Sequence, residues 1–229
     1  MALLLIVSFI VVPNQTSNAY ATCKCVVFRL DDVQDYFLTE ARMKVMNLFE
    51  KENASLTIGI IGNFFGNDTR IVSFVKNETK QPQFQFANHG WNHEDFSLLS
   101  EAKQSALLGK TNKKLHDLLG VTPKIFLAPL DGINNDTLLA AEENGIKFVS
   151  ANMTRDPPPY NIGDAEAKVY RMPTTAATGD LSRDGKRWIG FNHTKVFGDI
   201  QQSLAKYGFA VVTMHPQEYS IRNNFDYKE

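Results

Sequence analysis

The sequence has little cysteine, no excess charge of either sign and no apolar run long enough to cross a bilayer. Its only cysteines, Cys23 and Cys25, have no later cysteine to pair with across a fold, which excludes a disulfide framework. The 24 Lys and Arg balance 25 Asp and Glu, and no basic run occurs. Because affinity for nucleic acid comes from clustered positive charge, we expect no nucleic-acid partner.

The longest apolar run lies at the start of the chain. Residues 3–12 carry no charge, but a span of the bilayer core needs about 20 apolar residues. Pro13 and polar residues follow, and Ala-Tyr-Ala at 19–21 has the small-x-small pattern of a signal peptidase site. We therefore expect a signal peptide over 1–21 and a secreted or cell-surface domain over 22–229 without a transmembrane span. An uncleaved anchor is the alternative, because no Lys or Arg precedes the run.

Glycosylation triplets agree with export but are weak evidence. An asparagine-rich composition also generates Asn-x-Ser/Thr by chance, so their density favours an extracytoplasmic protein only mildly. The seven triplets begin at Asn14, Asn53, Asn67, Asn77, Asn135, Asn152 and Asn192.

The rest of the chain alternates short apolar runs with segments of helical spacing. Strands are expected over 25–30, 56–61, 84–87, 124–128, 147–151, 169–172 and 209–214. Helices are expected over 38–51, 67–76, 100–119 (with Ser100 as its cap), 134–144 and 194–207. Such alternation implies parallel strands joined by helical crossovers. No linker or repeat interrupts it, so the pattern predicts one α/β domain, a distorted (β/α) barrel of about seven parallel strands.

Polar residues follow the expected strands at the end where such barrels carry their chemistry. The first strand runs into Asp31 and Asp32, the third into His89 with His93 four residues on, and the last into His215. Each feature alone has a plain structural explanation, since most Asp pairs are solvated turns and a lone His at a strand end is more often structural. Neighbours on a regular strand point to opposite faces, so both Asp side chains can share a pocket only where the strand has ended.

Together these residues form a set that binds metal. One carboxylate and two imidazoles hold a borderline divalent ion such as zinc and leave positions open for water and substrate. By contrast, His116 lies within an expected helix and His193 within a glycosylation triplet, so we expect both at the surface.

The motifs resemble those of the polysaccharide deacetylase family, metal-dependent carbohydrate esterases with a NodB homology domain. The resemblance runs through 28–32 (Phe-Arg-Leu-Asp-Asp), 89–93 (His-Gly-Trp-Asn-His), 126–129 (Phe-Leu-Ala-Pro) and 214–215 (Met-His). It implies a distorted barrel and the removal of acyl groups, N-acetyl above all, from a glycan or an acetylated amino sugar.

The resemblance also implies a role for each matched residue. Asp31 becomes the general base and His215 the general acid, while Asp32, His89 and His93 bind one divalent ion, with zinc expected and cobalt or nickel as alternatives. Candidates for lining the substrate site, which could equally be packing residues, are Trp91, Pro129, Leu130 and Trp188.

Two motifs depart from the family pattern. The arginine that pairs with the catalytic base is replaced by Leu127, and Arg29 or Arg171 could substitute for it. The fourth motif, which supplies an Asp and a Trp, is unclear, and the nearest residues are Asp180, Asp184 and Trp188. These changes favour an unusual amide or ester over chitin as the substrate. They also leave open a metal amidohydrolase acting on a small non-sugar amide, and a non-catalytic relative that binds glycan.

Overall fold

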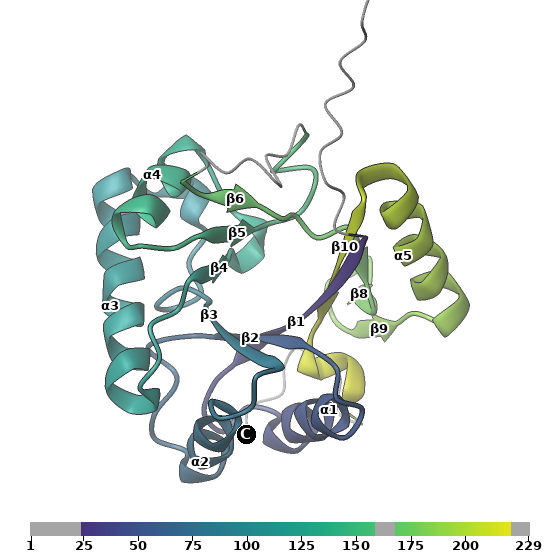
Figure 1. The fold of residues 1–229 in the computed structure, drawn as a ribbon, viewed down its shortest axis with the longest axis horizontal. Helices are drawn as coiled ribbons and strands as arrows, with labels where there is room; N and C mark the ends of the chain where they lie inside the picture. The colour runs from purple at the N-terminus through teal and green to yellow at the C-terminus, as the bar shows by residue number, and fades with distance from the viewer. Residues whose placement is uncertain (1–23, 159–167, 221–229) are drawn as a thin grey trace, which may run out of the picture.

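The computed structural model describes residues 24–158 and 168–220 (Figure 1). The helices are α1 (Thr39–Lys51), α2 (Thr69–Glu78), α3 (Glu101–Leu119), α4 (Asn135–Glu143) and α5 (His193–Tyr207), with short 3-10 helices η1 (Phe96–Leu98), η2 (Pro129–Asp131) and η3 (Pro216–Tyr219). The strands are β1 (Cys25–Val33), β2 (Leu56–Ile60), β3 (Phe84–Asn88), β4 (Ile125–Leu127), β5 (Phe148–Ser150), β6 (Tyr170–Arg171), β7 (Ala176–Ala177), β8 (Gly179–Leu181), β9 (Trp188–Gly190) and β10 (Phe209–Met214).

Eight strands form one parallel sheet in the order β6-β5-β4-β3-β2-β1-β10-β7. Figure 1 shows them as an arc with α3 and α4 along one side, α1 and α2 below and α5 on the opposite side. The prediction of a distorted parallel barrel is confirmed. The sheet has one strand more than expected because β7, only Ala176–Ala177, is too short to leave an apolar pattern in the sequence.

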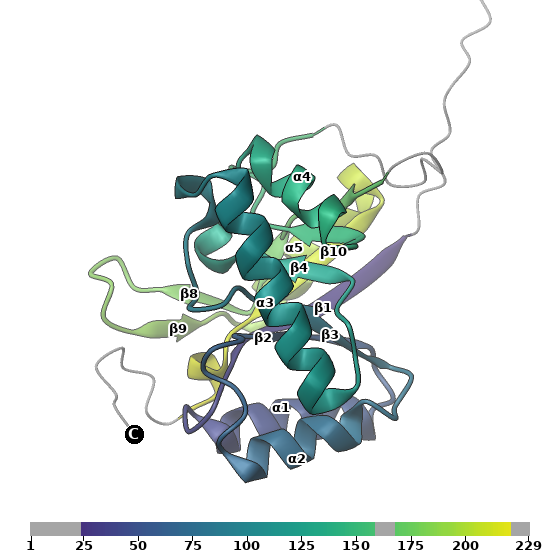
Figure 2. The same cartoon turned by 90° about the vertical axis from the view of Figure 1, so that its left-hand side faces the viewer.

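The segment between β7 and α5, which contains Gly179 and Gly185 and matches neither strand nor helix periodicity, is expected from the sequence to be a loop, but the structure differs. It forms an antiparallel hairpin in which β8 pairs with β9, and Figure 2 shows this hairpin projecting from the body of the barrel. Gly185 lies in its turn with φ 70°, a conformation that favours glycine. The hairpin becomes important below because it carries Trp188.

Alternation along β1 places apolar side chains against the helices and Arg29 and Asp31 on the other face. On β1, Leu30 belongs to a core cluster packed against the helices, together with Met46 of α1 and Ile58 of β2. Arg29 and Asp31 lie on the opposite face because successive strand residues point to opposite sides. A second cluster, which includes Phe126 of β4, packs against α3 and α4. The apolar runs therefore stabilise the barrel against its helices, while Arg29 and Asp31 face its interior.

One expected helix cap is different in the structure. Ser100 precedes α3 as predicted, but its side chain makes no capping hydrogen bond. Instead, Asp136 of α4 accepts a hydrogen bond from the N–H of Glu101 at 3.2 Å. A carboxylate at this end also interacts favourably with the helix dipole, so α4 supplies the cap that the local sequence suggested for Ser100.

The amino-terminal predictions lie largely outside the described residues. The expected signal peptide, 1–21, is among the residues that are not described. Among the described residues, Cys25 is disulfide-bonded. Within 24–158 and 168–220, none of the helices has the length and apolar character needed to span a bilayer.

Candidate active site

The predicted site residues gather in a groove of about 470 Å³ at the carboxyl ends of the strands. The β8–β9 hairpin and η3 form part of its wall. Eight of the eleven candidate residues line it: Arg29, Asp31, Asp32, His89, His93, Leu130, Trp188 and His215.

The other three candidates lie elsewhere. Trp91 packs toward α3, where the ammonium of Lys110 is 3.9 Å from its ring centroid. Pro129 is buried beside the loop at Gly90. Arg171 donates to Asp156 at 2.6 Å. Of the four candidate substrate contacts, only Leu130 and Trp188 therefore line the groove.

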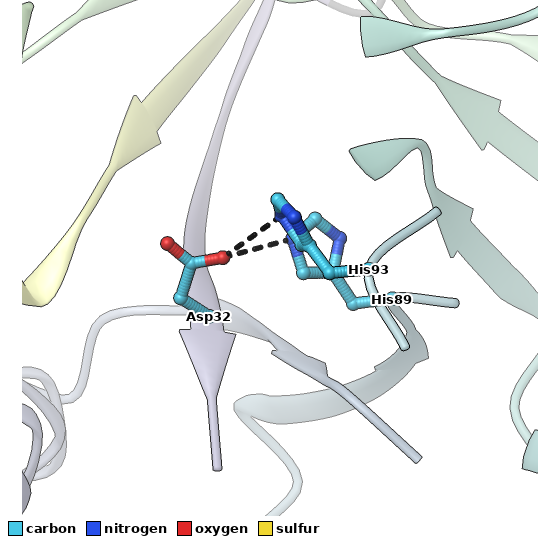
Figure 3. Close-up of side chains that lie close together, drawn as sticks. All are labelled: Asp32, His89 and His93. Atoms are coloured by element: carbon cyan, nitrogen blue, oxygen red, sulfur yellow. Dashed lines mark hydrogen bonds and ion pairs between the residues drawn. The ribbon is translucent and has the colours of Figure 1, made fainter. Parts of the chain in front are cut away.

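Three side chains form a candidate metal centre (Figure 3). Oδ1 of Asp32 is 3.3 Å from Nε2 of His89 and 3.2 Å from Nε2 of His93. Ligand atoms bound about 2.1 Å from a tetrahedral zinc ion lie about 3.4 Å from one another. The distances from the carboxylate to both imidazoles therefore match two edges of such a site.

The environment of His89 fixes which ring nitrogen faces the centre. Its Nδ1 is 2.8 Å from the carbonyl oxygen of Leu127, which can only accept a hydrogen bond. The proton of neutral His89 therefore lies on Nδ1, and the lone pair of Nε2 points toward Asp32. Two acceptor atoms facing each other in this way suit a shared cation, so these residues fit a divalent metal ion.

The backbone at two of these residues is left-handed. Asp32 has φ 62° and His93 has φ 63°, values that are uncommon for non-glycine residues and cluster at functional sites. The pairing of β1 with β2 shifts register between Leu30 and Val33. Asp31 and Asp32 can therefore both face the groove inside a continuing strand, whereas the sequence argument required the strand to have ended.

The loop between the two histidines is held by a carboxylate. Oε2 of Glu94 accepts hydrogen bonds from the backbone N–H groups of Trp91 at 3.0 Å and Asn92 at 2.9 Å. Gly90, with φ 74°, allows the turn that precedes them. The imidazoles of His89 and His93, four residues apart, therefore come together through a turn held by Glu94 and not through a helix. The sequence analysis missed this role of Glu94.

Asp31 forms a buried ion pair with Arg29. Nε of Arg29 donates to Oδ1 of Asp31 at 2.9 Å, and Nη2 donates to Oδ2. Nη1 donates to the hydroxyl of Ser150 at 2.9 Å, and both ion-pair side chains are only 2% exposed. Burial acts to raise the pKa of Asp31, but the charge of Arg29 holds it below its usual value. Asp31 therefore stays ionised, as a general base requires.

His215 lies between an aromatic ring and a buried carboxylate. Trp188 of the hairpin stacks on the imidazole with ring centroids 4.2 Å apart. Nδ1 of His215 is 3.4 Å from Oε1 of Glu218, whose side chain is 1% exposed. Burial acts to lower the pKa of His215, but the carboxylates of Glu218, Asp32 and Asp31 raise it above its usual value.

Glu218 is the carboxylate that the sequence analysis missed. It is anchored by the N–H of His215, which donates to Oε1 at 3.2 Å, and by the hydroxyl of Thr178, which donates to Oε2. Asp180 is exposed, and Asp184 accepts a hydrogen bond from Ser182 at the exposed hairpin tip. A Glu three residues after His215, at the start of a 3-10 turn, was the available signal.

Arg29 also borders a second space inside the barrel. An apolar cavity of about 250 Å³ opens among residues near the amino ends of the strands, and its lining includes Val26, Leu56 and Ile125. Arg29 lines both spaces, and its Nη1 lies within hydrogen-bonding distance of Ser150 and Thr174. We call Arg29, Ser150 and Thr174 the floor of the groove.

The fold and the groove together define a class of protein, a parallel β/α barrel with a candidate cation site at the carboxyl ends of its strands. The model of the polysaccharide deacetylase family matches residues 18–149, more than half of the 229 residues. The chain belongs to this family.

Similar proteins include both active and inactive members of this fold. The chain is 27% identical over 101 residues to the protein YlxY of Bacillus subtilis (strain 168), covering 44% of this chain and 30% of that protein. It is 14% identical to a CE4 family pseudoenzyme from Bacillus anthracis, with a TM-score of 0.55 over 84% of this chain and 55% of that one. A family 4 carbohydrate esterase from Streptomyces lividans, solved with acetate, is 16% identical with a TM-score of 0.52, covering 83% of this chain and 78% of that one. The chain thus spans about a third of YlxY and about half of the pseudoenzyme.

Proposed function

We propose that the protein is a metal-dependent hydrolase that removes acyl groups, N-acetyl above all, from a glycan. Family membership and the gathering of Asp31, Asp32, His89, His93 and His215 in one groove support this proposal. The observation that carries it is the buried Arg29–Asp31 pair. This pair supplies, from β1, the arginine that the third motif lacks, and it lies beside a complete set of metal ligands.

Asp32, His89 and His93 would hold one divalent ion, zinc in the first instance, with cobalt or nickel as alternatives. Such an ion supplies Lewis-acid chemistry, because it polarises a carbonyl and lowers the pKa of bound water. Asp31 accepts the proton of the attacking water, and Arg29 fixes the orientation of the receiving carboxylate.

The turn after β4 offers one donor to the developing oxyanion. The N–H of Ala128 already donates to Ser150 at 2.9 Å, and Pro129 has no N–H. The N–H of Leu130 is therefore the donor that residues 128–130 can provide.

His215 delivers the proton that the leaving amine needs. An amide nitrogen leaves poorly as an anion at neutral pH, so a protonated imidazole at this point lowers the barrier. Glu218 stabilises the protonated ring and sets its orientation, and Trp188 covers one face of it.

The substrate and location follow as part of the same proposal. Leu130, 66% exposed at the groove, and Trp188 offer apolar surface to an acetamido group or a sugar face. A near-neutral protein suits an uncharged glycan, and a signal peptide over 1–21 would deliver the domain to the cell surface or beyond. Since Arg29 supplies the missing base partner, the third motif no longer argues against ordinary acetamido sugars.

An acetate-release assay on the zinc-loaded full chain tests this function. We expect acetate from acetylated amino-sugar oligomers, and we expect Asp31→Asn to retain metal while losing release. Release from small non-sugar amides alone would identify the amidohydrolase instead. Binding of metal and glycan without any release would identify a non-catalytic relative. Full activity of Asp31→Asn would contradict the assigned base.

A further inference from the structure

A glutamine on η3 contacts the outer oxygen of the candidate metal ligand Asp32. Gln217 is 7% exposed and lines the groove. Its Nε2 donates to Oδ2 of Asp32 at 3.4 Å, while Oδ1 of the same carboxylate faces His89 and His93. The two oxygens of Asp32 therefore have different partners.

This contact restricts the orientation of the Asp32 carboxylate. Without a hydrogen-bond partner, the carboxylate of Asp32 could rotate about its side-chain bonds. The left-handed backbone at Asp32 also changes the direction in which this side chain leaves the strand. A donor on Oδ2 selects the rotation that directs Oδ1 toward the imidazoles. Hydrogen bonds to ligating carboxylates generally act in this way at metal centres.

The other end of the Gln217 amide is not used by the described residues. Its Oε1 is buried and has no hydrogen-bond partner within 24–158 and 168–220. An unpaired buried acceptor destabilises a fold, so an apolar side chain of similar length would suit packing better. A position that departs from what packing favours is typical of a functional role.

We propose that Gln217 is a positioning residue for the metal ligand Asp32. The inference rests on the metal set of the proposed function. Because His215 lies two residues earlier on the same turn, Gln217 also ties the proton donor to the metal centre.

The test measures zinc and cobalt affinity of the full chain by competition with a chelator, without substrate. Gln217→Met keeps the length of the side chain and removes the donor. We expect metal affinity to fall roughly 10- to 100-fold and the visible spectrum of bound cobalt to change. The melting temperature of the metal-free protein should stay level or rise, since the unpaired Oε1 is gone.

A second variant and a control complete the test. Gln217→Asn keeps the amide but shortens its reach by one methylene, so it should also weaken metal binding. It tests the proposal even if Gln217→Met fails to fold. Tyr219→Phe, on the same turn but outside the metal set, should bind metal as the wild type does. Unchanged affinity in both Gln217 variants, or a lower metal-free melting temperature with unchanged affinity, would overturn the proposal. Because no substrate is used, a failure to release acetate leaves this result interpretable.

Discussion

The two halves of the barrel contribute different parts of the site. Residues 24–151 contain β1–β5 and α1–α4. They contribute Asp31 and all three candidate metal ligands. Residues 168–220 contain strands of mostly two or three residues, the hairpin and α5, and supply His215, Glu218 and Trp188. The candidate metal ligands therefore belong to the first half and the candidate proton donor to the second, and substitutions should separate the two proposed roles.

The largest effect is expected from His89→Ala in the first half. Removing one of three ligands should abolish metal binding and lower acetate release by roughly three orders of magnitude, since metal stabilisation is worth several kcal/mol. Metal content after dialysis and the circular dichroism of the folded chain check this. His116→Ala, an exposed residue of α3, is the matched control and should bind metal normally. Retained metal in His89→Ala would place the centre elsewhere.

A comparable loss of activity without loss of metal is expected from His215→Ala in the second half. General acid catalysis contributes about 10²- to 10⁴-fold, so acetate release should fall within that range while metal content stays at one ion per chain. A simultaneous loss of metal would show that the two halves are not separable in the way proposed.

The Arg29–Asp31 pair should affect stability as well as rate. Arg29→Leu leaves a buried carboxylate unpaired and should cost about 3–5 kcal/mol of unfolding free energy, measured by denaturant titration. Leu127 and Asp31 both lie within 4 Å of the position that a Cβ on Gly59 would occupy. Adding Leu127→Arg should therefore recover part of the lost stability and activity, by returning the arginine to the third motif. If the double variant recovered neither stability nor activity, an arginine at position 127 could not replace Arg29 of β1 as the partner of Asp31.

The smallest effect is expected from Glu218→Gln. Its charge raises the pKa of His215, so its removal should lower that pKa. Activity that needs protonated His215 is lost as pH rises through this pKa, so the alkaline limb of the pH–rate profile should move to lower pH. We expect a loss of activity on the alkaline side that is smaller than the loss in His215→Ala, with metal affinity unchanged. An alkaline limb at the same pH as in the wild type would contradict the role of Glu218 in raising the pKa of His215.

The sequence predicted the first half better than the second for a physical reason. In the first half, strands such as β1 and β2 are long and largely apolar, so periodicity located them. By contrast, β7, β8 and β9 have two or three residues each, and their pairing depends on neighbours far along the chain. The hairpin was expected as a loop for this reason.

The site shows a similar division. Asp31 and Asp32 lie near the carboxyl end of β1, and His89, His93 and His215 follow β3 and β10, so these residues could be located from the rule for strand ends and from the family resemblance. Glu94, Glu218 and Gln217 act through contacts within turns, which carry no periodic signal. Trp91 resembled a substrate contact in sequence, yet its ring turns toward Lys110 of α3, which only tertiary packing decides.

The floor formed by Arg29, Ser150 and Thr174 lies between the groove and the apolar cavity. The arginine that pairs with Asp31 therefore borders both spaces. In the proposed reaction, a small acid would be released beside Asp31, on the groove side of this floor. We therefore expect the acid to occupy part of the substrate site before it leaves, and so to act as a product inhibitor that competes with substrate.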